Sequence, residues 1–370
     1  MKIRICRDEE MRLGDIFKLS SGKSLPEKKR TAGEYNVYGG NGVTGKHNEY
    51  FVEEPTIVIG RVGEYCGAVH LTTDKCWVTD NALMVTNWFK EVDKEFLVYV
   101  LTAMNLHQYA KTVGQPSISQ GNIYDLEIDL PEIGQQREIV NILNRVNGII
   151  NSRRKELQKL DELIKARFVE MFGDPISNDK NWNVGTINEI GTCVAGATPS
   201  TKENKYWQNG TIPWMSSGEV NKGRIFETNE KITKLGYENA STKLVPPKTV
   251  VLAMAGQGRT RGTVAITEIE LCTNQSICSI VNNEKINSEF LLNYLKMHYK
   301  KLRNTSTNSE GRGGLNLKII GNYPVFIPPI ELQNRFADFA REVDKSREII
   351  QKQIDTYQEL FDKLMQEYFS

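Results

Sequence analysis

The second half of this chain repeats the layout of its first half. The segment LPEIGQQREIVNIL (130–143) returns as IPPIELQNRFADFA (327–340), and ELIKARFVEMFG (162–173) returns as ELFDKLMQEYFS (359–370) at the same offset. Such self-similarity means that one architecture stands twice in the chain, so the fold must contain two related units. The halves differ by about twenty extra residues early in the second one, around TPSTKENKYWQNGTIPWMSSGEVNKG (198–223).

Each half is expected to hold a globular section followed by one long helix. Short β-rich runs such as TIVIGR are broken by Gly, Pro and Asn, and one amphipathic helix follows them, near 93–112 and near 288–303. Asp93 and Ser288 are the expected N-caps of these helices. The predicted class is α+β, with two similar mixed α/β domains held apart by two long antiparallel coiled-coil helices in a pseudo-two-fold repeat. The expected boundaries are 1–130 and 174–327 for the domains, and 131–173 and 328–370 for the helical spacers.

Apolar residues spaced alternately by four and three positions mark the helical sections. A sustained period of 3.5 residues is the signature of a coiled-coil seam, and Gly173 and Pro175 end the first run. About 35–40 residues at 1.5 Å rise would make each helix roughly 55 Å long. Two equivalent units pack most simply about a two-fold axis, so we expect antiparallel pairing. The residues expected at this helix-pair and partner interface are Ile139, Leu143, Val146, Ile150, Leu157, Leu160, Ile164, Phe336, Val343, Ile350, Ile354, Tyr357, Phe361 and Leu364.

No group of residues in the sequence suggests catalysis or a metal site. The four His and six Cys are scattered, without CxxC pairs or ligand spacing, so we expect reduced thiols in a cytoplasmic protein. No apolar run has the length of a membrane span, and no signal peptide is expected.

One enzymatic alternative rests on GNGVTGKH (40–47), which has the glycine and lysine spacing of a phosphate-binding P-loop. A nucleotide hydrolase would use Lys46 there. However, His47 stands where a hydroxyl should hold Mg²⁺, and the flanks do not read as an apolar strand and a helix. The pattern favours a glycine-rich loop between strands.

The net charge is only +1, but it is distributed unevenly. Lys and Arg outnumber Asp and Glu within 182–327, whereas 1–130 and 328–370 are net acidic. Two similar domains on a fixed spacer suit a ligand with two parts, and DNA presents successive major-groove faces about 34 Å apart. Arg pairs with guanine and Asn or Gln with adenine, while Lys and backbone N–H groups hold phosphates. A coiled-coil scaffold that binds only proteins is the second alternative.

The chain resembles a known family over essentially its whole length. The resemblance is carried by LGDIFKLSSGK (13–23), YNVYGGNGVTGKHNEY (35–50), ATPSTKENKYW with IPWMSSGEV (197–220) and GGLNLKIIGNYPVFIPPIELQNRF (313–336), together with the duplicated layout. These features are similar to the specificity subunit of type I restriction-modification enzymes. The family's helical motif usually has an acidic residue where this chain has Gln135 and Leu332.

The resemblance implies one target recognition domain in each half, reading the two parts of a bipartite site in double-stranded DNA. It implies that the helices dock two methyltransferase subunits, which bind S-adenosylmethionine. It also implies a separate restriction and translocase subunit that uses ATP and Mg²⁺. The chain itself is expected to be a non-catalytic guide without a cofactor.

Candidate DNA-binding residues lie in the Gly-rich and polar stretches, because such loops present side chains and backbone N–H groups to a ligand. The stretch AGQGRTRG (255–262) is the strongest local candidate, with two Arg flanked by Gly. Those of the first domain are Lys23, Asn41, Lys46, Arg61, Gln115 and Ser117, and those of the second are Trp214, Ser216, Gln257, Arg259, Arg261, Asn274, Arg312 and Asn316.

Overall fold

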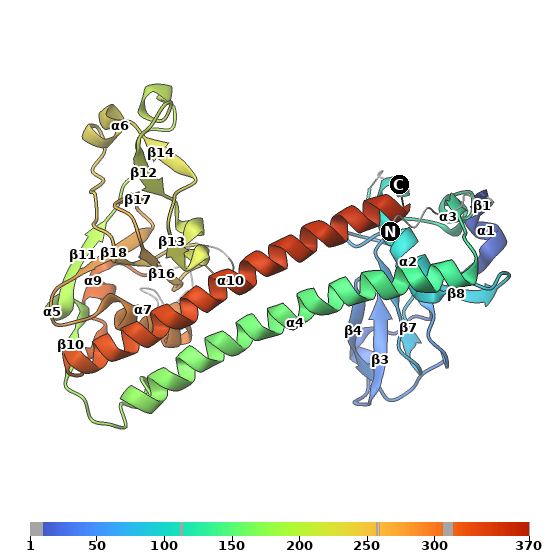
Figure 1. The fold of residues 1–370 in the computed structure, drawn as a ribbon, viewed down its shortest axis with the longest axis horizontal. Helices are drawn as coiled ribbons and strands as arrows, with labels where there is room; N and C mark the ends of the chain where they lie inside the picture. Colours follow the sequence, from blue (N-terminus) through green and yellow to red (C-terminus); the bar gives the residue numbers. More distant parts are fainter. Residues whose placement is uncertain (1–9, 112–113, 257, 259, 306–313, 370) are drawn as a thin grey trace. The chain divides into compact units, whose positions relative to one another are not determined.

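The computed structural model describes residues 10–111, 114–256, 258, 260–305 and 314–369 (Figure 1). The chain divides into two compact units. Unit 1 comprises Met1–Arg154 with Lys352–Ser370, and unit 2 comprises Lys155–Gln351. Within the described ranges, no helix is long and apolar enough to cross a membrane.

Unit 1 contains a four-stranded antiparallel sheet and a smaller three-stranded sheet. The large sheet has the order β2 (Phe17–Ser21), β8 (Ala82–Trp88), β5 (Ile57–Gly60) and β6 (Val69–Leu71). The small sheet has the order β4 (Gly42–His47), β3 (Tyr35–Gly39) and β7 (Trp77–Val78). A separate pair joins β1 (Glu10–Arg12) to β9 (Glu127–Asp129). The short helices are α1 (Leu13–Ile16), η1 (Glu27–Lys29), α2 (Lys94–Ala103), η2 (Leu106–Tyr109) and α3 (Gln120–Tyr124).

The large sheet of unit 1 is buried on both faces, because alternate residues of a strand point to opposite sides. Ile57 and Ile59 of β5 face a core shared with α2 and the long helices, whereas Val58 faces a core shared with the small sheet. This explains why the run IVIG is apolar throughout.

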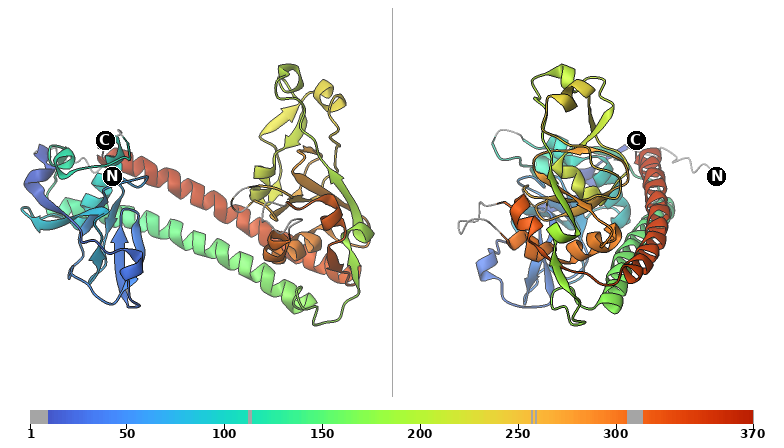
Figure 2. Two further views of the ribbon diagram at one scale, coloured as in Figure 1. Left: turned by 180° about the vertical axis from the view of Figure 1, so that it is seen from behind. Right: turned by 90° about the vertical axis from the view of Figure 1, so that its left-hand side faces the viewer.

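Unit 2 contains the same sheets with one additional strand. The large sheet has the order β11 (Gly191–Ala195), β18 (Ile277–Asn282), β15 (Val250–Ala253), β16 (Val264–Thr267) and β13 (Arg224–Ile225). The small sheet has the order β14 (Glu230–Ile232), β12 (Ile212–Met215) and β17 (Cys272–Thr273), and β10 (Val184–Thr186) pairs with β19 (Pro324–Phe326). The short helices are α5 (Ile187–Ile190), η3 (Asn204–Tyr206), η4 (Ser217–Lys222), α6 (Lys234–Glu238), α7 (Ser288–Met297), α8 (Tyr299–Asn304) and α9 (Leu317–Gly321). Figures 1 and 2 show the small sheet and α6 of this unit beyond the large sheet, on the side away from α7.

The repeat predicted from the sequence is confirmed down to strand pairing. The order β2-β8-β5-β6 matches β11-β18-β15-β16, and β4-β3-β7 matches β14-β12-β17. In both small sheets the third strand pairs in parallel with the middle one, Tyr38 opposite Val78 and Met215 opposite Thr273. The two units therefore share one topology.

The insertion of unit 2 lies partly outside the region expected for it. In unit 1 the strands β3 and β4 are joined by the tight turn at Gly40 and Asn41. In unit 2 the matching connection contains η4 and β13 and continues to Asn229, beyond the expected limit near 223. The strand β13 adds the fifth member of the large sheet.

Two helices of 40 residues each, α4 (Ile133–Phe172) and α10 (Ile330–Phe369), contribute to both units. The N-terminal part of α4 packs with the C-terminal part of α10 in unit 1, and the opposite ends pack together in unit 2, so the pairing is antiparallel as predicted. All fourteen predicted seam residues are buried or half-buried. Gly173 ends α4 with a φ of 79°, a left-handed conformation that favours glycine.

The seam departs from the predicted period near the end of α4. Continued past Ile164, the spacing of three and four would put Arg167 and Met171 in the seam. They are only half-buried, whereas Phe168 and Phe172 are fully buried. The ring of Phe168 stacks on Phe290 of α7 at 5.3 Å and meets Phe336 of α10 edge-on at the same distance. This part of α4 therefore packs as an ordinary core helix.

A buried glutamine joins each long helix to its unit. In unit 2 the Gln333 side chain donates to the Pro328 carbonyl at 2.8 Å and accepts from the Asn287 N–H at 2.8 Å. In unit 1, Gln136 makes the matching bonds to Pro131 and Asp93. Asp93 caps α2 as predicted.

The predicted cap of α7 is wrong by one position. Asn287 is the N-cap, and its side chain accepts from the Glu289 N–H, whereas Ser288 is the first helical residue. In each unit the buried glutamine of the long helix therefore accepts from the backbone N–H of the N-cap residue of the short helix. This bond fixes the start of α4 against α2, and the start of α10 against α7.

A network of charged residues joins the inserted strand to the helices of unit 2. Arg224 of β13 forms ion pairs with Glu268 at 2.6 Å, Glu289 at 2.7 Å and Asp344 of α10 at 2.5 Å. Burial alone would lower the pKa of the Arg224 guanidinium, but Glu289 and Asp344 raise it above its ordinary value. The network holds α10 against the strand that unit 1 lacks.

Replacement of Gln333 should destabilise unit 2. Gln333→Ala leaves a buried N–H at Asn287 and a buried carbonyl at Pro328 without their partner, which we expect to cost about 2–5 kcal/mol. Urea denaturation followed by tryptophan fluorescence measures the loss. Gln208→Ala is the matched control, since Gln208 is an exposed residue of the same unit. Equal free energies of unfolding for the two variants would show that the Gln333 hydrogen bonds do not stabilise unit 2.

Candidate nucleic-acid interface

Five connections of unit 1 meet at one end of its sheets. The Arg61 carbonyl accepts from the Ile118 N–H at 2.9 Å, and the Arg61 N–H donates to the Asn81 carbonyl at 2.9 Å. Gly40 of the β3–β4 turn lies close to Gly60, since a Cβ there would stand 3.6 Å from the Gly60 Cα. The loop after β2 joins them, because the Gly22 N–H donates to the Ala82 carbonyl. We call the segments 21–23, 40–41, 61–63, 79–81 and 114–118 the loop cluster of unit 1.

The loop cluster brings together several of the predicted residues of unit 1. Arg61 and Gln115 are exposed, and Ser117 is half-buried in the bridge that pairs it with Val62. The Arg61 guanidinium makes one long hydrogen bond, 3.3 Å to the Ser21 hydroxyl. Asn41 is exposed at the tip of the β3–β4 turn. These side chains can therefore meet a ligand without disturbing the core.

The two predicted lysines of unit 1 have different settings. The Lys23 amine lies 4.3 Å from the centroid of the Phe51 ring, and the Lys23 carbonyl accepts from the Trp77 indole at 2.9 Å. Lys46 is exposed on β4, opposite Asn36 of β3. Because residues 42–47 form this strand of a hairpin, the P-loop alternative is wrong: Lys46 does not lie between a strand and a helix N-terminus.

Unit 2 builds a loop cluster from the matching connections. The Met254 carbonyl accepts from the Leu315 N–H at 3.0 Å, and the Met254 N–H donates to the Ser276 carbonyl at 2.8 Å. Gly196, like Gly22 in unit 1, lies so close to the neighbouring strand that a Cβ would overlap its backbone. The loop cluster of unit 2 comprises 196–198, 216–218, 254–256, 274–276 and 314–316.

Several predicted residues of unit 2 already use their side chains within the protein. The Asn316 carboxamide caps α9 by accepting from the Ile319 N–H at 2.9 Å, and that of Asn274 accepts from the Ser276 N–H at 3.0 Å. Ser216 is half-buried and bonds Glu219 in a capping box. These three bonds shape the loops themselves.

Trp214 is buried with 6% of its surface exposed. Its indole N–H donates to the Ala197 carbonyl at 2.9 Å, and its ring meets Trp207 edge-on at 5.0 Å. This setting favours a packing role over a DNA contact. Gln257, Arg259 and Arg312 lie outside the described residues, and the neighbouring Arg261 is half-buried.

The sequence analysis missed two exposed side chains beside these loops. Gln275 follows Asn274 and bonds the Thr198 hydroxyl at 2.5 Å. Tyr65, with 47% of its surface exposed, lies between Arg61 and Gly67. Aligning TDNA (79–82) with TNQS (273–276) across the repeat could have identified Gln275. No signal in the sequence singles out Tyr65.

In the described part of the chain, no three His, Cys, Asp or Glu side chains gather so that they could hold an ion. Burial raises the pKa of the Cys66 and Cys76 thiols, which keeps them protonated and unreactive. What the two loop clusters offer is hydrogen-bonding side chains and backbone N–H groups on rigid sheets.

Comparison with known proteins agrees with this geometry. A family model described as "Type I restriction modification DNA specificity domain" matches residues 8–162 and again 179–357. The specificity subunit of the EcoprrI type I restriction enzyme of Escherichia coli is 31% identical over 38% of this chain and 36% of its own length. That of MjaVIII of Methanocaldococcus jannaschii is 21% identical over 98% of this chain and 92% of its own length.

The fold is also known. The crystal structure of a type I restriction-modification S subunit from M. genitalium superposes with a TM-score of 0.66 at 17% identity, covering all of this chain and 98% of that one. The two matches of the family model span both units and most of the chain. The chain therefore belongs to the family of type I restriction-modification DNA specificity subunits.

Proposed function

We propose that each unit reads one half of a bipartite DNA site through its loop cluster. The observation that carries this proposal is that one topology brings the same connections together twice, with different side chains each time. Unit 1 presents Arg61, Gln115 and Asn41, whereas unit 2 presents Gln275, with the half-buried Arg261 outside its loop cluster. Two equal scaffolds with unequal side chains fit a site whose two halves differ in sequence.

The chemistry of the loop clusters suits base-edge recognition. An Arg side chain pairs with guanine through two hydrogen bonds, and Gln or Asn pairs with adenine in the same way. Lys23, Lys46 and backbone N–H groups would hold phosphates and fix the register. The residues 257, 259 and 312 stay in the proposed set on the strength of the sequence alone.

The long helices would set the distance between the half-sites and dock partner subunits. Forty residues at 1.5 Å rise give each helix a length of about 60 Å. Their outer faces expose large apolar side chains at Ile149, Leu163, Ile349 and Leu360. Exposed apolar side chains of this kind favour a protein partner.

The proposed partners follow from the family. Two methyltransferase subunits carrying S-adenosylmethionine would dock on the helices, and a restriction and translocase subunit using ATP and Mg²⁺ would join them in the cytoplasm. The chain itself would guide the chemistry without performing it.

Methylation mapping tests the proposal. The chain is co-expressed with the methyltransferase encoded beside it, and the methylated bases of the host DNA are sequenced. We expect a motif in two parts with a constant gap. Assembly with the methyltransferase but no methylated motif would favour the protein-binding scaffold instead.

Arg61→Ala should weaken recognition at one position of one half-site. Removing a base-pairing Arg is expected to cost about 1–3 kcal/mol of binding and to relax the motif at that base. Methylation mapping with the variant complex measures both effects. Arg12→Ala is the control, because Arg12 is also exposed and only pairs with Glu127 at 3.4 Å. A uniform loss on all sequences would make Arg61 a phosphate contact.

Lengthening both helices should lengthen the gap. Seven residues inserted after Arg154 and seven after Gln351 preserve the seam, because two turns return the helix to nearly the same face. The pair grows by about 10 Å, so the gap should widen by roughly three base pairs at 3.4 Å each. As a control, the same seven residues inserted after the exposed Lys90, outside both long helices, should leave the gap between the half-sites unchanged. An unaltered gap in the helix variant would show that the helices do not set the spacing.

A further inference from the structure

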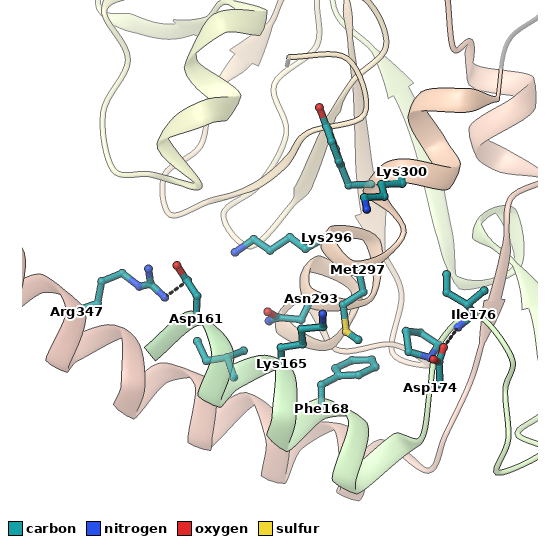
Figure 3. Close-up of a pocket in the computed structure, with 13 residues that line it drawn as sticks. Asp161, Lys165, Phe168, Asp174, Ile176, Asn293, Lys296, Met297, Lys300 and Arg347 are labelled. Carbon is teal, nitrogen blue, oxygen red and sulfur yellow. Dashed lines mark hydrogen bonds and ion pairs between the residues drawn. The ribbon is translucent and has the colours of Figure 1, made fainter. Parts of the chain in front are cut away.

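A cavity of about 500 Å³ lies in unit 2, where the end of α4 meets α7 and α8 (Figure 3). Its floor is apolar, formed by Ile164, Phe168 and Met297. Lysines from three different elements line it: Lys165 of α4, Lys296 of α7 and Lys300 of α8. All three side chains are exposed to solvent.

No hydrogen bond or ion pair joins the three amines to the residues that the structure describes, although Asp344 and Asp161 attract Lys296 from a distance. The nearby Arg347, in contrast, is paired. Arg347 pairs with Asp161 at 2.6 Å and with Asp344 at 3.3 Å. Figure 3 shows this pair at one side of the cavity, with Lys296 lying across the space beside it. Asp161 is thus paired with Arg347, and Asp174, the other carboxylate of the lining, accepts from the Ile176 N–H at 2.7 Å. Because the lining holds three lysines and one arginine against these two carboxylates, it is positive overall.

The surroundings make the charge on Lys296 costly. The cavity walls lower the pKa of the Lys296 amine by removing solvation, although the side chain stays accessible from the cavity itself. An anion placed in the cavity would offset this cost. Lysine is suited to phosphate as a compact charge with three N–H donors.

The lysine cavity is continuous with the recognition loops. A second cavity of about 360 Å³ shares Lys296 and Arg347 with it and reaches Gly262 and Thr263, at the end of the Gly- and Arg-rich stretch 255–262. Arg303 lies along the same path, with its guanidinium donating to the Tyr299 hydroxyl at 2.9 Å. Positive side chains thus extend from the helix pair to the loops proposed to read bases.

Two of these lysines are not repeated in unit 1, where the cavity between α2 and the end of α10 is lined instead by Glu10, Glu127 and Asp129. Across the repeat, Thr102 stands where unit 2 has Lys296, and Asp362 stands where unit 2 has Lys165. A partner present in two equal copies would require matching residues in both units. The asymmetry therefore favours a ligand that meets unit 2 alone, at the half-site that it reads.

We propose that Lys165, Lys296 and Lys300 bind backbone phosphates of duplex DNA beside the half-site of unit 2. The inference rests on the proposed function and adds to it a sequence-independent contact. Such contacts fix the register of a protein on DNA without specifying bases. Two of the three, Lys296 and Lys300, belong to the positively charged stretch 182–327.

The test removes the three charges together. The triple variant Lys165→Gln, Lys296→Gln, Lys300→Gln is assembled with the methyltransferase, and its binding to cognate and unrelated duplexes is titrated over a range of salt concentrations. Each phosphate contact contributes about 0.9 to the slope of log affinity against log salt. We expect the slope to fall by about 2–3, an equal loss on both duplexes, and an unchanged methylated motif.

The control carries the same change of charge elsewhere in unit 2. Lys231→Gln, Lys234→Gln, Lys285→Gln alters three exposed lysines outside the cavity and should leave the slope unchanged. An unchanged slope in the cavity variant would overturn the phosphate contact while leaving the proposed function intact. Impaired assembly with normal DNA binding of the assembled fraction would also overturn it, and would assign the cavity to an acidic segment of the partner. Failure of the wild-type complex to methylate a two-part motif would count against the proposed function instead.

Discussion

The rest of the structure depends on burial of the same two helices in two separate cores. The helix α4 supplies Ile139 and Leu143 to the core of unit 1, and Phe168 and Phe172 to that of unit 2. Burying each such side chain contributes about 1.5–3 kcal/mol. Neither core is complete without both helices, so the antiparallel pairing is a condition of folding. The buried glutamines then fix where each helix begins.

In the described part of the chain, unit 2 has a structural feature that unit 1 lacks, the inserted strand β13. Unit 2 uses its inserted strand to place Arg224 among three carboxylates, one of them on α10. Partly buried ion pairs of this kind are weak evidence for added stability, because desolvation offsets much of the attraction. Loss of Arg224 would be costly, however, since it leaves the Glu289 carboxylate buried without its cation. We read the network as fixing the position of β13 against the helix.

The sequence predicted the features that arise from periodic burial and missed those decided by tertiary packing. The repeat, the seam and the Asp93 cap are periodic or local signals, and the structure confirms them. Near the end of α4 the buried residues Ile164, Phe168 and Phe172 are four apart, because this stretch packs on α7 and not only on α10. Asn316 and Asn274 show why the sequence does not identify the DNA-binding residues of the loops. An asparagine that shapes a turn and one that reads a base both occur in polar, Gly-rich segments, so spacing alone does not separate them.

In the two loop clusters, the backbone holds the loops together and the exposed side chains are left to meet a ligand. They are joined mainly by backbone hydrogen bonds, such as those from Ile118 to Arg61 and from Leu315 to Met254. A bond between backbone groups does not depend on which side chain the residue carries. The exposed side chains can therefore change while the cluster keeps its shape. This is consistent with a chain that keeps the fold of an S subunit at 17% identity. Under the proposed function, a few exposed side chains of each cluster would set the target bases, because the topology is the same in both units although their side chains differ.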